Sequence, residues 1–161
     1  MDYPEPQRSQ ILDYLFKPQF GASLDIIKVE IGGDVQSTSG TEASHMHTRD
    51  DLGCTRGYEG WILSEARKRN PAIKTWGLSW GVPAWIGVSA GGQMGQGSYF
   101  SRDNIHYQTQ WLKCMNDSYG VDVNYIGIWN ERSSGPMEYS ILLRQSLDAA
   151  GFANTKIVFA R

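Results

Sequence analysis

The 161-residue chain lacks the features of several protein classes. No apolar run approaches the roughly 20 residues that a membrane-spanning helix needs. The acidic, polar start Met1-Asp2-Tyr3-Pro4 does not have the pattern of a signal peptide. The formal net charge is −2, so the charge balance indicates neither nucleic acid nor an anionic membrane as a partner. The basic run at 67–69 is interpreted as a solvated helix face, because acidic residues lie nearby.

Cysteine and metal-binding patterns are scarce as well. The two cysteines, Cys54 and Cys114, allow one disulfide at most, and the sequence leaves open whether they form it or stay free thiols. Two histidines within 45–47 and two aspartates at 50–51 could suggest a metal, but no third close set of ligands is evident. We favour a loop-packing role for this segment and expect neither a metal nor a cofactor.

Aromatic and apolar residues, in contrast, are plentiful. Hydrophobic residues make up 40% of the chain, which is enough for one packed domain over residues 1–161. Six tryptophans and eight tyrosines contribute to an aromatic content of 12%. The flat face of Trp suits a sugar ring, so this content fits a carbohydrate enzyme, although many core-rich domains have similar usage.

The hydrophobic pattern predicts strands that alternate with helices. Helices are predicted over 6–17, 57–69, 102–119 and about 136–150, strands over 24–31, 73–79, 121–129 and 156–160, and a long polar loop over 35–56. Such alternation is typical of a parallel sheet with right-handed crossovers. A (β/α)8 TIM barrel needs about 250 residues. The predicted α/β fold is therefore a barrel fragment of about four parallel strands, with an open four-stranded sheet as the alternative.

Polar and aromatic residues follow three of the predicted strands, at the edge where parallel sheets carry their chemistry. They are Gly32 to Asp34, Trp80, and the pair Asn130-Glu131. A carboxylate that follows an apolar strand is expected to be partly desolvated and suited to proton transfer. The adjacent Asn130 can hydrogen-bond a sugar 2-hydroxyl. The alternative interpretations are a strand-end Glu131 paired with Arg132 or another surface charge, and a core role for Trp80.

Four segments carry a specific resemblance. They are "YPEPQRSQILDYLFKPQFGASLDIIKVEIGGD" over 3–34, "GTEASHMH" over 40–47, "EARKRNPAIKTWGLSW" over 65–80 and "YIGIWNER" over 125–132. In this order they resemble the galactocerebrosidase family, glycoside hydrolase family 59. The resemblance covers essentially the whole chain and is weakest at 48–56 and 86–120.

The resemblance implies a retaining β-galactosidase that cleaves galactosylceramide, a glycosphingolipid, in the lysosome, without a metal or cofactor and with a saposin-type lipid carrier as partner. Glu131 matches the general acid/base of the family, and Asn130 and Trp80 match substrate-binding residues. Thr38 matches a Thr that hydrogen-bonds the sugar, a residue that would otherwise be interpreted as an ordinary loop hydroxyl.

The family's nucleophile is a second Glu on a later strand, and this sequence ends before that strand. Glu30, Asp34 and Glu42 could substitute on paper, but none is assigned the role. Glu30 shares a strand face with Lys28 and is expected to point into the barrel. We therefore expect this chain alone to be inactive. Its unpaired strand edges further predict marginal stability or aggregation.

Two other functions compete with this interpretation. Gly87-Val88-Ser89-Ala90-Gly91 matches G-x-S-x-G, the nucleophile elbow of serine esterases. The Gly-rich residues that follow make a poor helix, and Pro83 interrupts the strand that an elbow requires. The second alternative is a non-catalytic, truncated form that binds sugar or lipid.

Overall fold

The computed structural model describes residues 3–35, 41–86, 99–132 and 135–159. Its elements follow the predicted order, and most of their bounds differ from the prediction by only one or two residues. They are α1 (Gln7–Phe16), β1 (Ile26–Ile31), α2 (Glu59–Arg69), β2 (Lys74–Ser79), α4 (Arg102–Tyr119), β3 (Tyr125–Gly127), α5 (Met137–Ala149) and β4 (Lys156–Val158).

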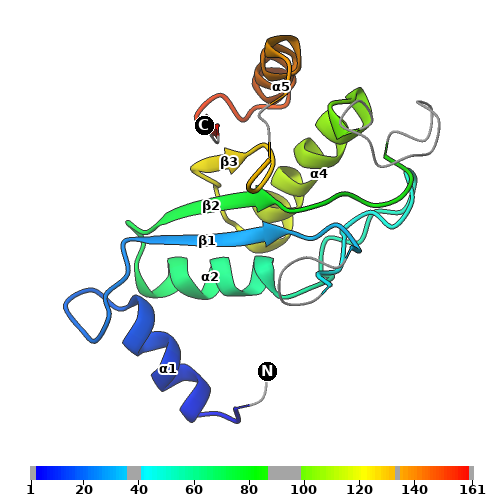
Figure 1. Cartoon of the computed structure of the whole chain (residues 1–161). Coiled ribbons are helices and arrows are strands. Elements are labelled where there is room, and N and C mark those ends of the chain that lie inside the picture. Colours follow the sequence, from blue (N-terminus) through cyan, green and yellow to red (C-terminus); the bar gives the residue numbers. More distant parts are fainter. Residues whose placement is uncertain (1–2, 36–40, 87–98, 133–134, 160–161) are drawn as a thin grey trace.

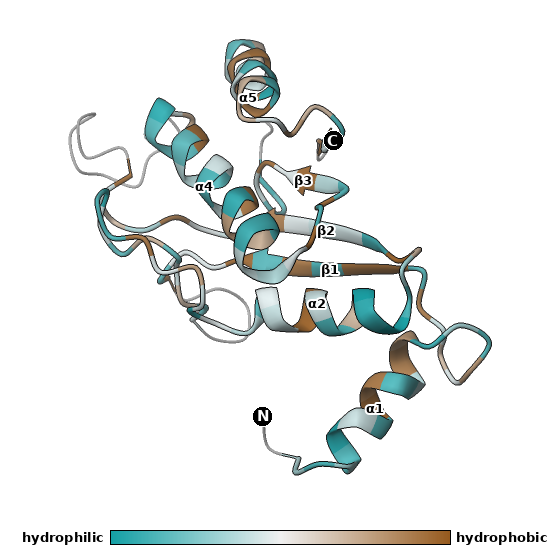
Figure 2. Cartoon of the chain, turned by 180° about the vertical axis from the view of Figure 1, so that it is seen from behind, coloured by the Kyte–Doolittle hydropathy of each residue, from teal (hydrophilic) through white to brown (hydrophobic). Residues whose placement is uncertain are grey.

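The four strands form one sheet in the order β1-β2-β3-β4, and all three neighbouring pairs are parallel. In Figure 1 the arrows of β1 and β2 point the same way, and α2 runs along β1. Figure 2 shows β1 as largely hydrophobic, whereas α2 and α4 mix hydrophilic and hydrophobic positions as amphipathic helices do. The α/β fold predicted from the alternation is therefore confirmed.

The core lies between the sheet and its helices. Ile31 of β1 and Ile126 of β3 are fully buried there. The indole of Trp111 on α4 packs directly over Gly77 of β2, where an added Cβ would lie 2.6 Å from two of its ring atoms. Because Gly77 carries no side chain, α4 can approach the strand closely.

Both ends of α4 have clear causes in the sequence. At its start, the side chain of Ser101 accepts a hydrogen bond from the backbone N–H of Asn104 at 3.3 Å. At its end, Gly120 adopts a left-handed conformation with φ 64°, which a residue without Cβ enters at little cost. The bounds predicted for this helix, 102–119, are confirmed.

The third strand is shorter than predicted, since β3 covers Tyr125–Gly127 instead of 121–129. Val121 and Val123 are buried in the core, so their apolar pattern reflects burial rather than strand pairing. At the start of the strand, the side chain of Asn124 takes the place of a backbone partner and accepts a hydrogen bond from the N–H of Thr75 at 3.0 Å.

A disulfide settles the state of the two cysteines. Cys54, in the segment after β1, is bonded to Cys114 of α4, 60 residues later. The basic run on α2 is a solvated face only in part. Lys68 is exposed and pairs with Glu65 at 2.7 Å, whereas Arg69 is half-buried between Glu65 at 2.6 Å and Asp13 of α1 at 2.7 Å. No helix of the described residues is long and apolar enough to cross a membrane.

Candidate active site

A cavity of about 330 Å³ runs from the middle of β1 and β2 to the carboxyl ends of β3 and β4. Glu131 is the one carboxylate among its described lining residues, and Lys28 is the one cation. The lining consists of Lys28, Trp76, Leu78, Gly127, Ile128, Trp129, Asn130, Glu131, Val158 and Phe159. The structure thus places the sequence-predicted pair Asn130-Glu131 in a hollow with aromatic walls.

Two hydrogen bonds fasten the end of β3 to the end of β2. The indole N–H of Trp129 donates to the carbonyl oxygen of Trp80 at 3.0 Å. The backbone N–H of Asn130 donates to the carbonyl oxygen of Ser79 at 2.8 Å. The predicted site residues Trp80 and Asn130 therefore belong to one cross-linked unit, although they are 50 residues apart in the sequence.

An aromatic cluster fixes Trp129 from the other side. Its ring stacks on Tyr99 with centroids 3.8 Å apart and an interplanar angle of 3°. Phe100 adds an edge contact to Trp129 at 5.8 Å, and the Tyr99 hydroxyl donates to the carbonyl oxygen of Ile128. Offset stacks and edge contacts of this kind stabilise by roughly 0.5–1.5 kcal/mol each beyond their buried area. The turn that carries Asn130-Glu131 therefore rests on a rigid base.

Glu131 itself has an unusual backbone, with φ 52° in the left-handed region. A non-glycine residue in that region costs free energy, and such residues gather at functional sites. The turn leaves the side chain exposed, so the expectation of a partly desolvated carboxylate is wrong for this structure. Glu131 and Arg132 are both exposed, as the surface interpretation expects, but among the described residues no ion pair joins them.

Trp80 is half-buried at the end of β2; it belongs to neither described core cluster and is not among the described residues that line the cavity. The ammonium group of Lys28 lies over its ring, 5.2 Å from the centroid. Thr38, the fourth predicted site residue, and the esterase-like motif at 87–91 lie outside the described residues.

A polar cluster that sequence reasoning missed lies at the end of β1. Asp34, with φ 57°, accepts hydrogen bonds from the backbone N–H of Ser44 at 2.8 Å and from Nδ1 of His47 at 2.7 Å. Burial works to raise the pKa of Asp34, but the hydrogen bonds from Ser44 and His47 outweigh it and hold that pKa below its usual value. The cluster fixes the start of the loop after β1.

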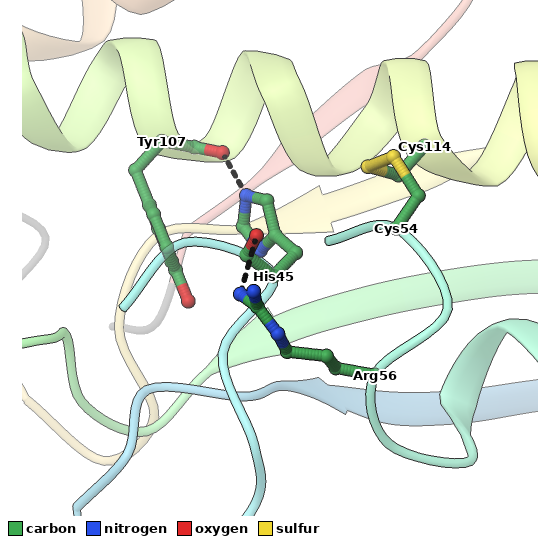
Figure 3. The surroundings of a disulfide bond; sticks show 5 residues. All are labelled: His45, Cys54, Arg56, Tyr107 and Cys114. Atoms are coloured by element: carbon green, nitrogen blue, oxygen red, sulfur yellow. Dashed lines mark hydrogen bonds between the residues drawn. A yellow bond between two sulfur atoms is a disulfide. The ribbon is translucent and has the colours of Figure 1, made fainter. Parts of the chain in front are cut away.

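His45, part of the possible metal segment, instead packs inside the protein. Its Nε2 donates to the carbonyl oxygen of Tyr107 at 2.9 Å, and its own carbonyl accepts from Arg56 at 3.3 Å (Figure 3). Burial lowers the pKa of His45 to about 4, so the ring is neutral. The disulfide between Cys54 and Cys114 lies close by. The loop-packing interpretation is confirmed for His45. Within the described residues, no three side chains of His, Cys, Asp or Glu lie close enough together to hold a metal ion.

Three glutamates form a second feature that the sequence did not reveal. Glu59, the first residue of α2, is buried, and this burial raises its pKa to about 8. A hydrogen bond with Glu42 and the charges of Glu42 and Glu30 act in the same direction. Glu30 is half-buried on the strand face of Lys28. The acidic residues at 30 and 42 thus surround a protonated neighbour at neutral pH.

Solved structures resemble this fold. An endo-beta1,6-glucanase matches with a TM-score of 0.72 at 20% identity, over 97% of this chain and 40% of that one. SrfJ from Salmonella typhimurium matches with a TM-score of 0.71 at 19% identity, over 96% and 39%. These likenesses support the interpretation of the sheet as part of a barrel and carry no statement about activity.

Sequence comparison gives closer relatives. Galactocerebrosidase from Danio rerio is 50% identical over 161 residues, which cover 99% of this chain and 24% of that protein. Galactocerebrosidase from Homo sapiens is 48% identical, with 98% and 22% covered. The chain thus spans about a quarter of the length of the curated relatives it matches. The profile of Glycosyl hydrolase family 59 matches residues 1–161, and the chain belongs to this family.

Proposed function

We propose that this chain forms part of a retaining β-galactosidase that hydrolyses the β-galactosyl bond of galactosylceramide. The observation that carries the proposal is the position of Glu131. It is the carboxylate of a cavity that also holds Asn130 and aromatic walls, at the strand ends where barrel enzymes place their chemistry. Family membership and the printed names of the relatives support the substrate class.

In this mechanism Glu131 acts twice. As an acid it protonates the glycosidic oxygen while a second carboxylate attacks the anomeric carbon, so that the ceramide leaves as an alcohol. As a base it then takes a proton from the water that cleaves the glycosyl-enzyme bond. Asn130 binds the 2-hydroxyl, Trp80 offers a ring face to the galactose, and Thr38 donates a further hydrogen bond.

The second carboxylate of a retaining enzyme lies about 5–5.5 Å from the first. Glu131 is the only carboxylate in the described lining of the cavity, so we assign the nucleophile to a segment outside this chain. This chain by itself would then bind the galactoside without hydrolysing it. The resemblance to the galactocerebrosidase family also implies a saposin-type carrier for the lipid and a lysosomal location.

The experiment compares the full-length protein with Glu131→Gln, using a fluorogenic β-galactoside and then galactosylceramide. Glu138→Gln, an exposed carboxylate in the first turn of α5, is the matched control. The proposal expects turnover by the parent protein and the control, and a fall of at least about a hundredfold in Glu131→Gln. Undiminished turnover by Glu131→Gln, or ester cleavage that Ser89→Ala abolishes, would contradict it.

A further inference from the structure

Lys28 is an exposed cation midway along a strand whose other residues, apart from Glu30, are apolar. It lies in the middle of β1, in the sequence Ile26-Ile27-Lys28-Val29, and it lines the same cavity as Glu131. Lysine is disfavoured in strands, where β-branched and aromatic residues pack better. The position therefore calls for a reason beyond strand formation.

The ammonium group of Lys28 lies against two indole rings. It is 5.4 Å from the ring centroid of Trp76 and 5.2 Å from that of Trp80. Both distances fall within the roughly 6 Å over which a cation is attracted to an aromatic face. Trp76 is the register partner of Lys28 on the neighbouring strand, so this contact is set by the sheet itself.

Trp80 is held by fewer contacts of the sheet than Trp76. It comes after the last residue of β2, where ladder pairing has ended. Its carbonyl oxygen is held by Trp129, but among the described residues no aromatic ring packs against its indole. Among the described residues, the cation that lies over the indole of Trp80 is Lys28. An ion-paired lysine would be less available for this role, and no described carboxylate forms a salt bridge with Lys28.

We propose that Lys28 is a positioning residue that holds the indole of Trp80, with its ammonium on one ring face and the opposite face left for the galactose ring. The inference rests on the proposed function.

The test uses the full-length protein with Lys28→Met, which keeps the length of the side chain, and Lys28→Arg, which keeps the charge. Lys17→Met is the matched control, because the ammonium of Lys17 lies 5.7 Å from the ring centroid of Phe20, away from the cavity lining. We expect Lys28→Met to raise KM about two- to fivefold with little change in kcat, as loss of an exposed cation–π contact would. Lys28→Arg should restore KM, and Lys17→Met should leave it unchanged.

A double-mutant cycle with Trp80→Leu, which has no ring, separates positioning from general destabilisation. If Lys28 acts through Trp80, adding Lys28→Met to Trp80→Leu should raise KM much less than it does in the parent protein. Near-UV circular dichroism supplies a readout that needs no activity: Lys28→Met should change the tryptophan bands, and the change should shrink in the Trp80→Leu background. Equal effects in both backgrounds, or unchanged KM and bands in Lys28→Met, would overturn the inference.

Failure of the proposed function gives a different pattern. In that case the parent protein does not cleave the β-galactoside, or Glu131→Gln cleaves it equally well, and the tryptophan bands alone decide whether Lys28 holds Trp80. Should Lys28→Met fold poorly, Lys28→Gln in the same cycle provides the same comparison, with the same two outcomes.

Discussion

The indole N–H of Trp129 donates to the carbonyl oxygen of Trp80 at 3.0 Å, and this bond joins the ends of two neighbouring strands. Trp129 directly precedes Asn130, and Trp80 is itself a residue of the candidate site. The stack of Trp129 on Tyr99 fixes the donor, so the bond also fixes the place of the backbone at Trp80. The turn that carries Asn130-Glu131 and the tryptophan proposed to bind sugar therefore share one support.

Trp129→Phe should test that support. Phenylalanine keeps a ring to stack on Tyr99 but has no N–H, so the carbonyl oxygen of Trp80 loses its partner. We expect a loss of about 1–3 kcal/mol in the free energy of unfolding, measured by urea denaturation of the full-length protein. Tyr99→Phe, which keeps the stack and removes the hydroxyl that donates to the carbonyl oxygen of Ile128, should lower stability by a similar amount. Equal stability of Trp129→Phe and the parent would show that the bond contributes little.

The disulfide should contribute much of the stability of the loop after β1. Cys54 and Cys114 are 60 residues apart, and closing a loop of that length is expected to stabilise by about 4 kcal/mol through the unfolded chain. Adding a reductant should therefore lower the thermal unfolding midpoint. The variant with both cysteines changed to serine should start from the lower midpoint and show no response to reductant. A reductant response in that variant would point to another cause.

Glu59 should make stability fall as the pH rises. Its pKa in the folded protein is about 8, against an ordinary value of 4.5, because the group is buried beside Glu42. The folded state therefore binds the proton more tightly, and the stability of the protonated form is fully present below pH 4.5 and is lost on rising through pH 8. Unfolding midpoints measured between about pH 6.5 and 8 should decline in the parent and much less in Glu59→Gln. A parent curve as flat as that of the variant would contradict a raised pKa.

His45 should have the opposite effect at lower pH. Burial depresses its pKa in the folded protein to about 4, from an ordinary value of 6.5. The stability of the neutral ring is present above pH 6.5 and is lost as the pH falls through 4, since the unfolded chain takes up the proton first. His45→Gln, which can still donate to the carbonyl oxygen of Tyr107, should unfold with a weaker acid dependence. Unchanged acid dependence in that variant would show that another group dominates.

The periodic elements could be predicted from the sequence, and the loop contacts could not. Helix α4 has both a capping Ser101 and a terminal Gly120, so local chemistry defines its bounds. The strand predicted over 121–129 was too long, because the burial of Val121 and Val123 produces the same apolar pattern as pairing.

The candidate site divides in the same way. Trp80, Asn130 and Glu131 follow strands, so the parallel topology alone brings them to one edge. The pairing of Asp34 with His47 and of Glu59 with Glu42 depends on how the loop after β1 folds back, which no periodicity records. The left-handed conformation of Glu131 could not be predicted either, because the position is not a glycine.

The central claim is that Glu131 transfers the proton, and chemical rescue of the full-length Glu131→Ala variant tests it most directly. On a β-galactoside whose leaving group needs no acid, such as a dinitrophenolate, the galactosyl-enzyme should still form in this variant, but its hydrolysis should be slow without a base. Azide, which attacks the anomeric carbon without a base, should restore turnover and release β-galactosyl azide. Turnover of Glu131→Ala that equals the parent without azide, or the absence of any azide product from a folded variant, would contradict the assignment.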